Sequence, residues 1–185
     1  MRHDMRADTL YRLFFALKPS VTVARQTDHL AESLGGGERR IRLDHQHVTL
    51  AVTADYVEYP YAVIKALLRA GTSIEAEPFD MRLDKLSFSN RSAALRPSRS
   101  VPLLNDLQRS IADAMWRAGI ALRPGWSFSP HQTLFYRDGP PSQQNIEGFL
   151  WSLDQFVLVC SHVGRTRHDI LGTWTLKGDG QYELF

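Results

Sequence analysis

The chain has 185 residues and a formal net charge of +2, with 22 Lys or Arg residues against 20 Asp or Glu residues. This length predicts a single domain with its own core, and a hydrophobic content of 43% excludes a chain that is disordered throughout. The lone Cys160 excludes an internal disulfide and a zinc site of clustered cysteines. The small charge argues against a broad surface for duplex DNA. No run approaches the ~20 apolar residues of a membrane span, so we expect a cytoplasmic protein.

Hydrophobic periodicity predicts the elements of the first half of the chain. Apolar residues that run together or alternate indicate strands, whereas a period near 3.6 residues indicates helices. Pro19 ends the first apolar run, and Gly35 begins a triple glycine that is typical of a helix end. In chain order, we predict a strand at 10–18, a helix from Ser20 to Gly35, a strand interrupted between 41–43 and 48–52, and a helix at 59–70 that ends before Gly71.

The second half contains more strands. Leu103, Leu107 and Ile111 are spaced for one face of a helix. Because hairpins and helices are mixed, the order favours an α+β fold over a doubly wound parallel sheet. In chain order, we predict a hairpin of strands at 79–89 and 93–96, a helix at 103–118, a strand at 131–136, a loop at 139–144, strands at 156–162 and 170–176, and an edge strand at 182–185.

One four-residue pattern occurs twice, as H-V-T-L at 47–50 and as H-Q-T-L at 131–134. Alternate side chains of a strand point to the same face, so each copy presents an imidazole and a hydroxyl together. A single histidine in a strand is usually a structural residue. Two H-x-T-L motifs arise by chance in about one of a thousand chains of this composition, so the repeated motif predicts a shared site.

Two histidines and two threonines are suited to displacement at phosphorus. With a usual pKa near 6.5, one imidazole can activate water while the other protonates a leaving oxygen. The hydroxyls of Thr49 and Thr133 can donate to the non-bridging phosphate oxygens. His47 and His131 without a nearby carboxylate pair make an incomplete metal site, so a metal centre is the weaker alternative. We therefore predict metal-independent hydrolysis of a phosphodiester.

Further matches surround the two motifs. The segments are R-L-F-F-A at 12–16, D-H-Q-H-V-T-L at 44–50, F-S-P-H-Q-T-L at 128–134 and G-R-T-R at 164–167, before Trp174. Together they resemble the two-histidine phosphoesterases, specifically the RNA 2′,3′-cyclic phosphodiesterases that are also called 2′-5′ RNA ligases. The resemblance implies a bilobal α+β fold in one domain, residues 1–185. Two antiparallel-rich sheets with flanking helices would be related by a pseudo-twofold axis around a central cleft, in a monomer.

The resemblance also implies an activity. The family hydrolyses the 2′,3′-cyclic phosphate at RNA ends to a 2′-phosphomonoester, with no metal and no other cofactor. By this analogy the partner is an RNA terminus or a small cyclic nucleotide, His47 is the proton donor and His131 is the proton acceptor. Two alternatives stay open, namely reversible 2′-5′ ligation of RNA ends with the same residues, and a nucleotide- or RNA-end-binding module with little turnover.

The sequence departs from the family at one position. The family usually carries arginine five residues after the second histidine, whereas Tyr136 stands there and Arg137 follows. Strict alternation puts Arg137 on the face of His131 and Thr133, so we predict that it binds phosphate, unless a bulge shifts it. A solvated Arg137 paired with Asp138 is the alternative. Further candidates for a substrate rim are Arg165, Arg167, Tyr136 and Phe14.

Overall fold

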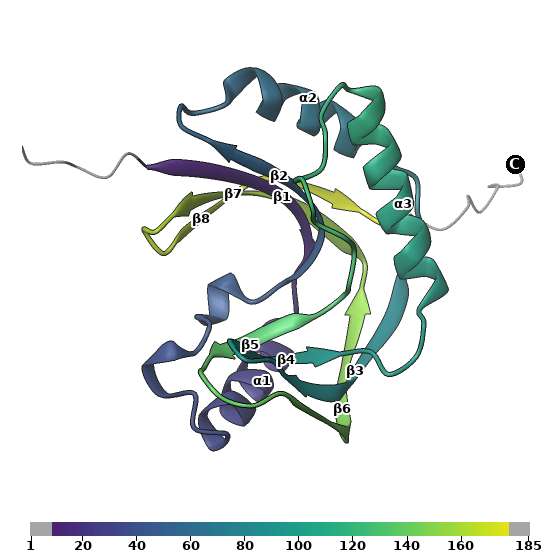
Figure 1. Ribbon diagram of the computed structural model, residues 1–185. Coiled ribbons are helices and arrows are strands. Elements are labelled where there is room, and N and C mark those ends of the chain that lie inside the picture. Colours follow the sequence, from purple (N-terminus) through teal and green to yellow (C-terminus); the bar gives the residue numbers. More distant parts are fainter. Residues whose placement is uncertain (1–8, 178–185) are drawn as a thin grey trace, which may run out of the picture.

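The computed structural model describes residues 9–177, which form one eight-stranded sheet with three α-helices (Figure 1). Every pair of neighbouring strands is antiparallel. The predicted α+β class is therefore confirmed. The elements are β1 (Leu10–Leu17), α1 (Val21–Ser33), η1 (Gly37–Arg39), η2 (Leu43–His45), β2 (Val48–Tyr56), α2 (Tyr61–Thr72), β3 (Phe79–Phe88), β4 (Ser92–Arg96), α3 (Pro102–Arg117), β5 (Gln132–Tyr136), β6 (Ser142–Leu153), β7 (Gln155–Val163) and β8 (Arg167–Thr175).

The strand order, β6-β3-β4-β5-β2-β1-β7-β8, divides the sheet into two four-stranded halves. The halves meet where β5 lies beside β2, and a single residue pair, Val48 with Gln132, is in register there. These two residues belong to the two H-x-T-L motifs. The two sheets implied by the resemblance are thus halves of one continuous sheet, because the first residues of β2 and β5 pair across the boundary.

Two hydrophobic clusters lie on opposite faces of the sheet. Leu13 and Phe15 of β1 belong to the larger cluster, which includes buried residues of all three α-helices. Phe14 and Ala16, which alternate with them, belong to a smaller cluster without helix residues. That cluster consists of Phe14, Ala16, Val52, Val157 and Val159. Because side chains alternate along a strand, the two clusters mark the two faces. We call the face of the smaller cluster the inner face; Figure 1 shows that the sheet bends and that α2 and α3 lie outside the bend.

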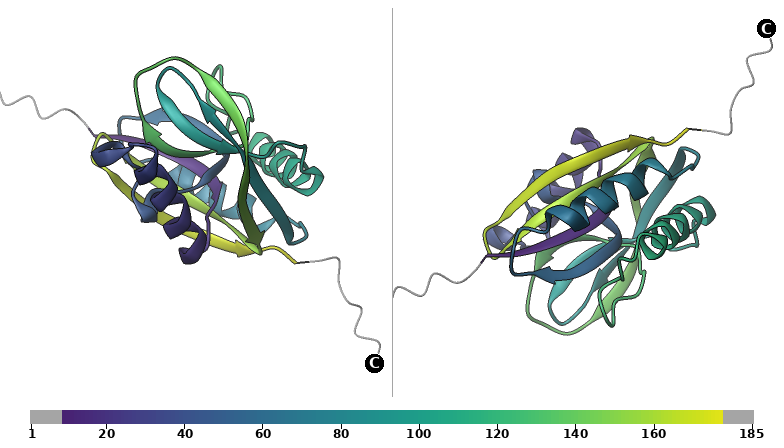
Figure 2. Two further views of the ribbon diagram at one scale, coloured as in Figure 1. Left: turned by 90° about the horizontal axis from the view of Figure 1, so that it is seen from below. Right: turned by 90° about the horizontal axis from the view of Figure 1, so that it is seen from above.

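The helices connect the two halves. Helix α1 follows β1 in the chain, yet it contacts β5 and β6 of the other half. Helix α2 contacts β7 and β8, and α3 contacts α2, β2 and β3. Figure 2 shows α2 and α3 side by side, with α1 elsewhere on the sheet. None of the helices within residues 9–177 is both long enough and apolar enough to cross a membrane.

Strand β6 is an edge strand that the sequence pattern did not predict. Its first residues, Ser142 to Gln144, lie within the segment predicted as a loop, and they are exposed. Backbone pairing with β3 along the whole strand holds them in place. Gly148, with φ of +81°, interrupts the alternation of β6 opposite an irregularity in β3. The sequence pattern does not reveal β6, because its residues are mostly polar and include a glycine. Its pairing with β3 places it in the sheet.

Other boundaries also differ from the prediction. Residues 41–43 do not form a strand: Arg40 makes an isolated bridge with Phe135, and a 3-10 turn begins at Leu43. Gly71 lies inside α2, which continues to Thr72. Glycine stands at this position because the Trp174 ring occupies the space that a Cβ atom would need. The edge strand expected at 182–185 lies outside the described residues.

Candidate active site

The register between β2 and β5 brings the two motifs together on the inner face. Val48 packs in the helix-side core, and the fully buried Gln132 donates to Thr27 of α1, so both point away from the inner face. The histidine and threonine on either side of each therefore point to the inner face. In this antiparallel register, each histidine lies opposite the threonine of the other motif. His47 and His131 are therefore diagonal neighbours, which stand about 7–8 Å apart in a regular sheet and leave room for a phosphate group between them.

Both imidazoles are held in the same way. Nδ1 of His47 lies 2.6 Å from the carbonyl oxygen of His45, and Nδ1 of His131 lies 2.7 Å from that of Ser129. A carbonyl oxygen can only accept, so each Nδ1 carries the proton and donates it. The neutral form of each ring therefore has its lone pair on Nε2. Each Nε2 can take a proton from one group and give it to another.

Burial keeps both histidines uncharged at neutral pH. It lowers the pKa of His47 from the usual 6.5 to about 4, with smaller contributions from the positive charges of Lys18 and His131. Burial also lowers the pKa of His131, and the positive charge of Arg96 contributes. A bound phosphate would raise both pKa values, because a nearby negative charge favours the imidazolium form.

Aromatic rings surround His47. Phe14, predicted as part of a substrate rim, is 5% exposed and stacks on the His47 ring with centroids 4.8 Å apart. The His168 ring meets His47 edge-on at 5.9 Å and stacks on His45 at 4.0 Å. Phe14 therefore supports the imidazole. The packing of His45 on His168 depends on the pairing of β8 with β7, which local sequence does not show.

The two threonines are available to a ligand. Thr49 and Thr133 are partly exposed. Within residues 9–177, neither hydroxyl hydrogen-bonds to another protein group. A hydroxyl that already points to the inner face beside an imidazole can donate to a phosphate oxygen.

A β-bulge in β5 reverses the directions in which Tyr136 and Arg137 were expected to point. Leu134 and Phe135 together stand opposite Ala93 of β4, which inserts one extra residue into β5. Both pack in the helix-side core, so Tyr136 turns to the inner face. Arg137 turns outward instead; its guanidinium lies 4.9 Å from the centre of the Phe88 ring and donates to the carbonyl of Pro140. The alternation that placed Arg137 beside His131 is broken by the bulge.

The two arginines of the G-R-T-R segment lie in the turn between β7 and β8 and at the first residue of β8. Arg165 is exposed in the turn between β7 and β8. Arg167 forms an ion pair with Asp169, at 2.9 Å, and is paired in register with His162. His168, the next residue, points to the inner face, so Arg167 points to the opposite face. The pairing of β8 with β7 thus turns Arg167 away from the inner face.

A buried polar network lies behind the two motifs. Gln46 precedes the first histidine, Gln132 follows the second, and both meet Thr27 of α1. Nε2 of Gln132 lies 3.0 Å from Oε1 of Gln46 and 2.9 Å from Oγ1 of Thr27. All three side chains are at most 2% exposed. Local sequence does not reveal these residues, because no pattern marks a glutamine beside an H-x-T-L motif as buried.

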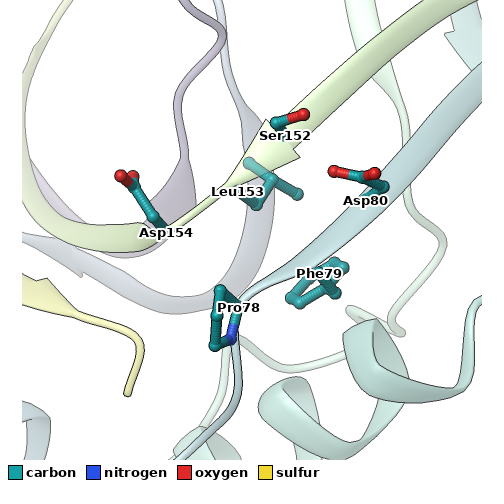
Figure 3. A pocket seen from close by; sticks show the side chains of 6 residues that line it. All are labelled: Pro78, Phe79, Asp80, Ser152, Leu153 and Asp154. Carbon is teal, nitrogen blue, oxygen red and sulfur yellow. The ribbon is translucent and has the colours of Figure 1, made fainter. Parts of the chain in front are cut away.

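Two surface pockets lie away from the motifs. One is lined by Pro78, Phe79, Asp80, Ser152, Leu153 and Asp154, where β3 and β6 meet (Figure 3). The other follows β2, between Asp55 and Val63. No residue of either H-x-T-L motif lines these pockets. In the described part of the chain, no group of three or more His, Cys, Asp or Glu side chains is arranged to hold a metal ion.

The geometry agrees with the family comparison. The sequence profile of the 2′-5′ RNA ligase superfamily matches residues 16–166, a segment that contains both motifs. The chain belongs to the 2′-5′ RNA ligase superfamily. The resemblance to two-histidine phosphoesterases is thereby confirmed. No curated protein matches the sequence.

Solved structures share the superfamily fold. Escherichia coli LigT, crystallised with 3′-AMP, is 23% identical with a TM-score of 0.75; the match covers 91% of this chain and 99% of LigT. TT0787 of Thermus thermophilus is 21% identical with a TM-score of 0.73, over 91% of this chain and 100% of TT0787. The ns2 PDE domain of MHV is 12% identical with a TM-score of 0.51, over 81% of this chain and 99% of that domain. At these identities the likeness shows the fold.

Proposed function

We propose that this protein hydrolyses the 2′,3′-cyclic phosphate at RNA ends, or in small cyclic nucleotides, to a 2′-phosphomonoester. One observation carries the proposal. His47 and His131 face the same side of the sheet, and each donates its Nδ1 proton to a backbone carbonyl. Two Nε2 atoms are thereby left for proton transfer, beside the hydroxyls of Thr49 and Thr133.

The reaction needs one proton acceptor and one proton donor. Nε2 of His131 takes a proton from water, and the water oxygen forms a bond to phosphorus. The bond between phosphorus and the 3′ oxygen breaks, and Nε2 of His47 gives its proton to that oxygen. His47 must be protonated at this point, and the negative charge of the bound phosphate favours that state. The threonine hydroxyls stabilise the charge on the non-bridging oxygens.

The comparisons support a nucleotide as ligand. LigT has been crystallised with 3′-AMP, ATP, NADP+ and phosphate. We extend this ligand class to the present chain because the two chains share a fold over most of their length. Recognition of a terminus also fits a net charge of only +2, since a long phosphate backbone is usually met by a large basic surface.

The test is hydrolysis of 2′,3′-cyclic AMP and of an RNA ending in a cyclic phosphate, in the presence of EDTA. His47→Ala and His131→Ala each reduce kcat about 100- to 10,000-fold, the usual value of a general acid or base. His29→Ala, at an exposed histidine of α1, serves as the matched control and keeps full activity. Full activity in either active-site variant, or strict dependence on a metal, contradicts the proposal.

A binding module with little turnover is the second candidate. The observation that favours it is Tyr136, which stands on the inner face in the place of the family's arginine. Tight binding of a 2′-phosphorylated nucleotide with no hydrolysis of any cyclic substrate would establish that function. Joining of RNA halves through a 2′-5′ linkage, assayed in the same samples, would establish the ligase activity.

A further inference from the structure

We infer that Arg96 supplies the positive charge that binds the substrate phosphate on the His131 side of the site. The inference rests on the proposed function, and it names a binding residue that the repeated motifs do not contain. A cyclic phosphodiester carries one negative charge. The mechanism provides one imidazolium, which balances that charge, but the 2′-phosphomonoester product carries about 1.5 to 2 negative charges at neutral pH, so the inner face needs a further cation.

The position of Arg96 follows from the pairing of β4. Ala93 and Leu95 pack in the helix-side core, so Ala94 and Arg96 point to the inner face. Ala94 is paired in register with Thr133, and Leu95 is paired with Gln132. Arg96 therefore follows directly after the two residues of β4 that border the second H-x-T-L motif, on the face of its threonine.

Arg96 is connected to His131 through one residue. Its Nη1 donates to Oγ of Ser129 at 2.7 Å, and the carbonyl oxygen of Ser129 accepts the Nδ1 proton of His131 at 2.7 Å. The positive charge of Arg96 also lowers the pKa of His131, which places the guanidinium within electrostatic range of the imidazole. An anion held beside His131 is thus within reach of the same guanidinium.

The charge of Arg96 is not compensated by a carboxylate in the described part of the chain. The arginines that do form ion pairs there are Arg12, Arg39, Arg40, Arg42, Arg109, Arg123 and Arg167. Partial burial without an acidic partner lowers the pKa of Arg96. A half-buried guanidinium with one N–H bonded to a serine has further N–H donors for the oxygens of a phosphate.

The other cations close to the site are ion-paired, turned away from the inner face, or placed on the side of His47. Arg12 and Arg123 share the carboxylate of Asp55, at 2.6 Å and 2.9 Å. Lys18, on the side of His47, donates to the backbone carbonyl of Asp44. Arg137, which follows Tyr136, is turned outward by the bulge in β5. Arg96 is therefore the cation that fits the phosphate best.

The test compares Arg96→Met with two matched controls in the full chain. Arg137→Met removes the arginine that follows the second motif, and Ser129→Ala removes the hydrogen bond of Arg96 but keeps its charge. We measure kcat and KM for 2′,3′-cyclic AMP, and the Kd of adenosine 2′-monophosphate and of inorganic phosphate by calorimetry. Arg96→Met raises KM and both Kd values about 10- to 100-fold, as expected for loss of a charge-assisted hydrogen bond. Arg137→Met remains within about threefold of the wild type, and Ser129→Ala, which keeps the charge of Arg96, loses less affinity than Arg96→Met.

Each outcome decides the inference. Wild-type Kd values in Arg96→Met overturn it, as does an equal loss of kcat with unchanged KM in Arg96→Met and Ser129→Ala, which would show that Arg96 only positions His131. Arg96→Lys keeps a charge and retains part of the affinity; this variant decides the question if Arg96→Met does not fold. Arg96-dependent binding of adenosine 2′-monophosphate, without hydrolysis by the wild type, supports the inference while the proposed function fails.

Discussion

At the scale of single residues, the environment of His47 sets its protonation. The ring packs on Phe14 and lies beside His168, and it donates its Nδ1 proton to a carbonyl. Burial favours the neutral ring, and the hydrogen bond orients it. The same surroundings lower the pKa of His168 to about 3, with burial as the main cause and His45 and His47 contributing.

The low pKa of His47 predicts a loss of stability in mild acid. The unfolded chain takes up a proton on this histidine near pH 6.5, whereas the folded chain does so near pH 4. The unfolded state therefore binds more protons between these values, so the free energy of unfolding falls as the pH is lowered from 6.5 to 4, and this contribution is constant below. We expect a contribution on the order of 3 kcal/mol.

Urea unfolding of the wild type and of His47→Asn at pH 7 and pH 4.5 measures this contribution. The difference in free energy of unfolding between the two pH values is smaller in His47→Asn, by roughly 2–3 kcal/mol. Groups that do not interact with His47 titrate in both proteins and cancel in the comparison. An identical pH dependence in the two proteins would show that His47 is not the group responsible.

At the scale of elements, the network of Gln46, Gln132 and Thr27 ties α1 to both motifs. Each glutamine is adjacent in sequence to the histidine of one H-x-T-L motif. The bond between Gln132 and Gln46 crosses the boundary between the two halves of the sheet. A shift of one motif relative to the other would separate the two Nε2 atoms, and a misplacement of 1 Å can reduce a rate about 100-fold.

We expect Gln132→Leu to reduce kcat about 10- to 100-fold with little change in KM, because the histidines lose their relative position but the phosphate ligands remain. The free energy of unfolding falls by about 1–3 kcal/mol, since buried partners are left unsatisfied. The double variant Gln46→Leu/Gln132→Leu separates the two effects. It regains stability but keeps the low kcat, whereas recovery of kcat together with stability would show that the network only stabilises the fold.

At the scale of the whole molecule, the connections between the halves predict cooperative unfolding. Helix α1 packs on the half of the sheet to which β1 does not belong, and α3 contacts both β2 and β3. Neither half therefore keeps a complete core without the other. Of the four tryptophans, Trp151 lies in β6 and Trp174 in β8, so these two report on different halves.

We expect one urea transition at which tryptophan fluorescence and far-UV circular dichroism change together. In a background in which Trp116 and Trp126 are replaced by phenylalanine, Trp151→Phe leaves Trp174 to report on the β8 half, and Trp174→Phe leaves Trp151 to report on the β6 half. In each variant, the fluorescence transition coincides with that protein's own circular dichroism transition, although the midpoints differ between variants. A fluorescence change that precedes the loss of secondary structure in either variant would show that one half unfolds independently.

Much of this protein could be predicted from local sequence. The repeated H-x-T-L motif predicted two histidines and two threonines on matching strands, and long periodic segments predicted the helices at 103–118 and 59–70. These features depend on neighbours within one element. The exposed edge strand β6 could not be found in the same way, because its polar residues alternate weakly and its pairing partner β3 lies far away in the chain.

Two H-x-T-L strands, with side chains suited to a phosphoester, could be predicted from local sequence alone. The charged residues that lie beside them could be identified only from the tertiary contacts. One extra residue in β5 turned Arg137 outward and Tyr136 inward, and the pairing of β4 brought Arg96 to the inner face. The physical reason is that the alternation of side chains along a strand follows from local sequence until a bulge shifts it by one residue. The approach of β4, β8 and α1 depends on long-range packing instead.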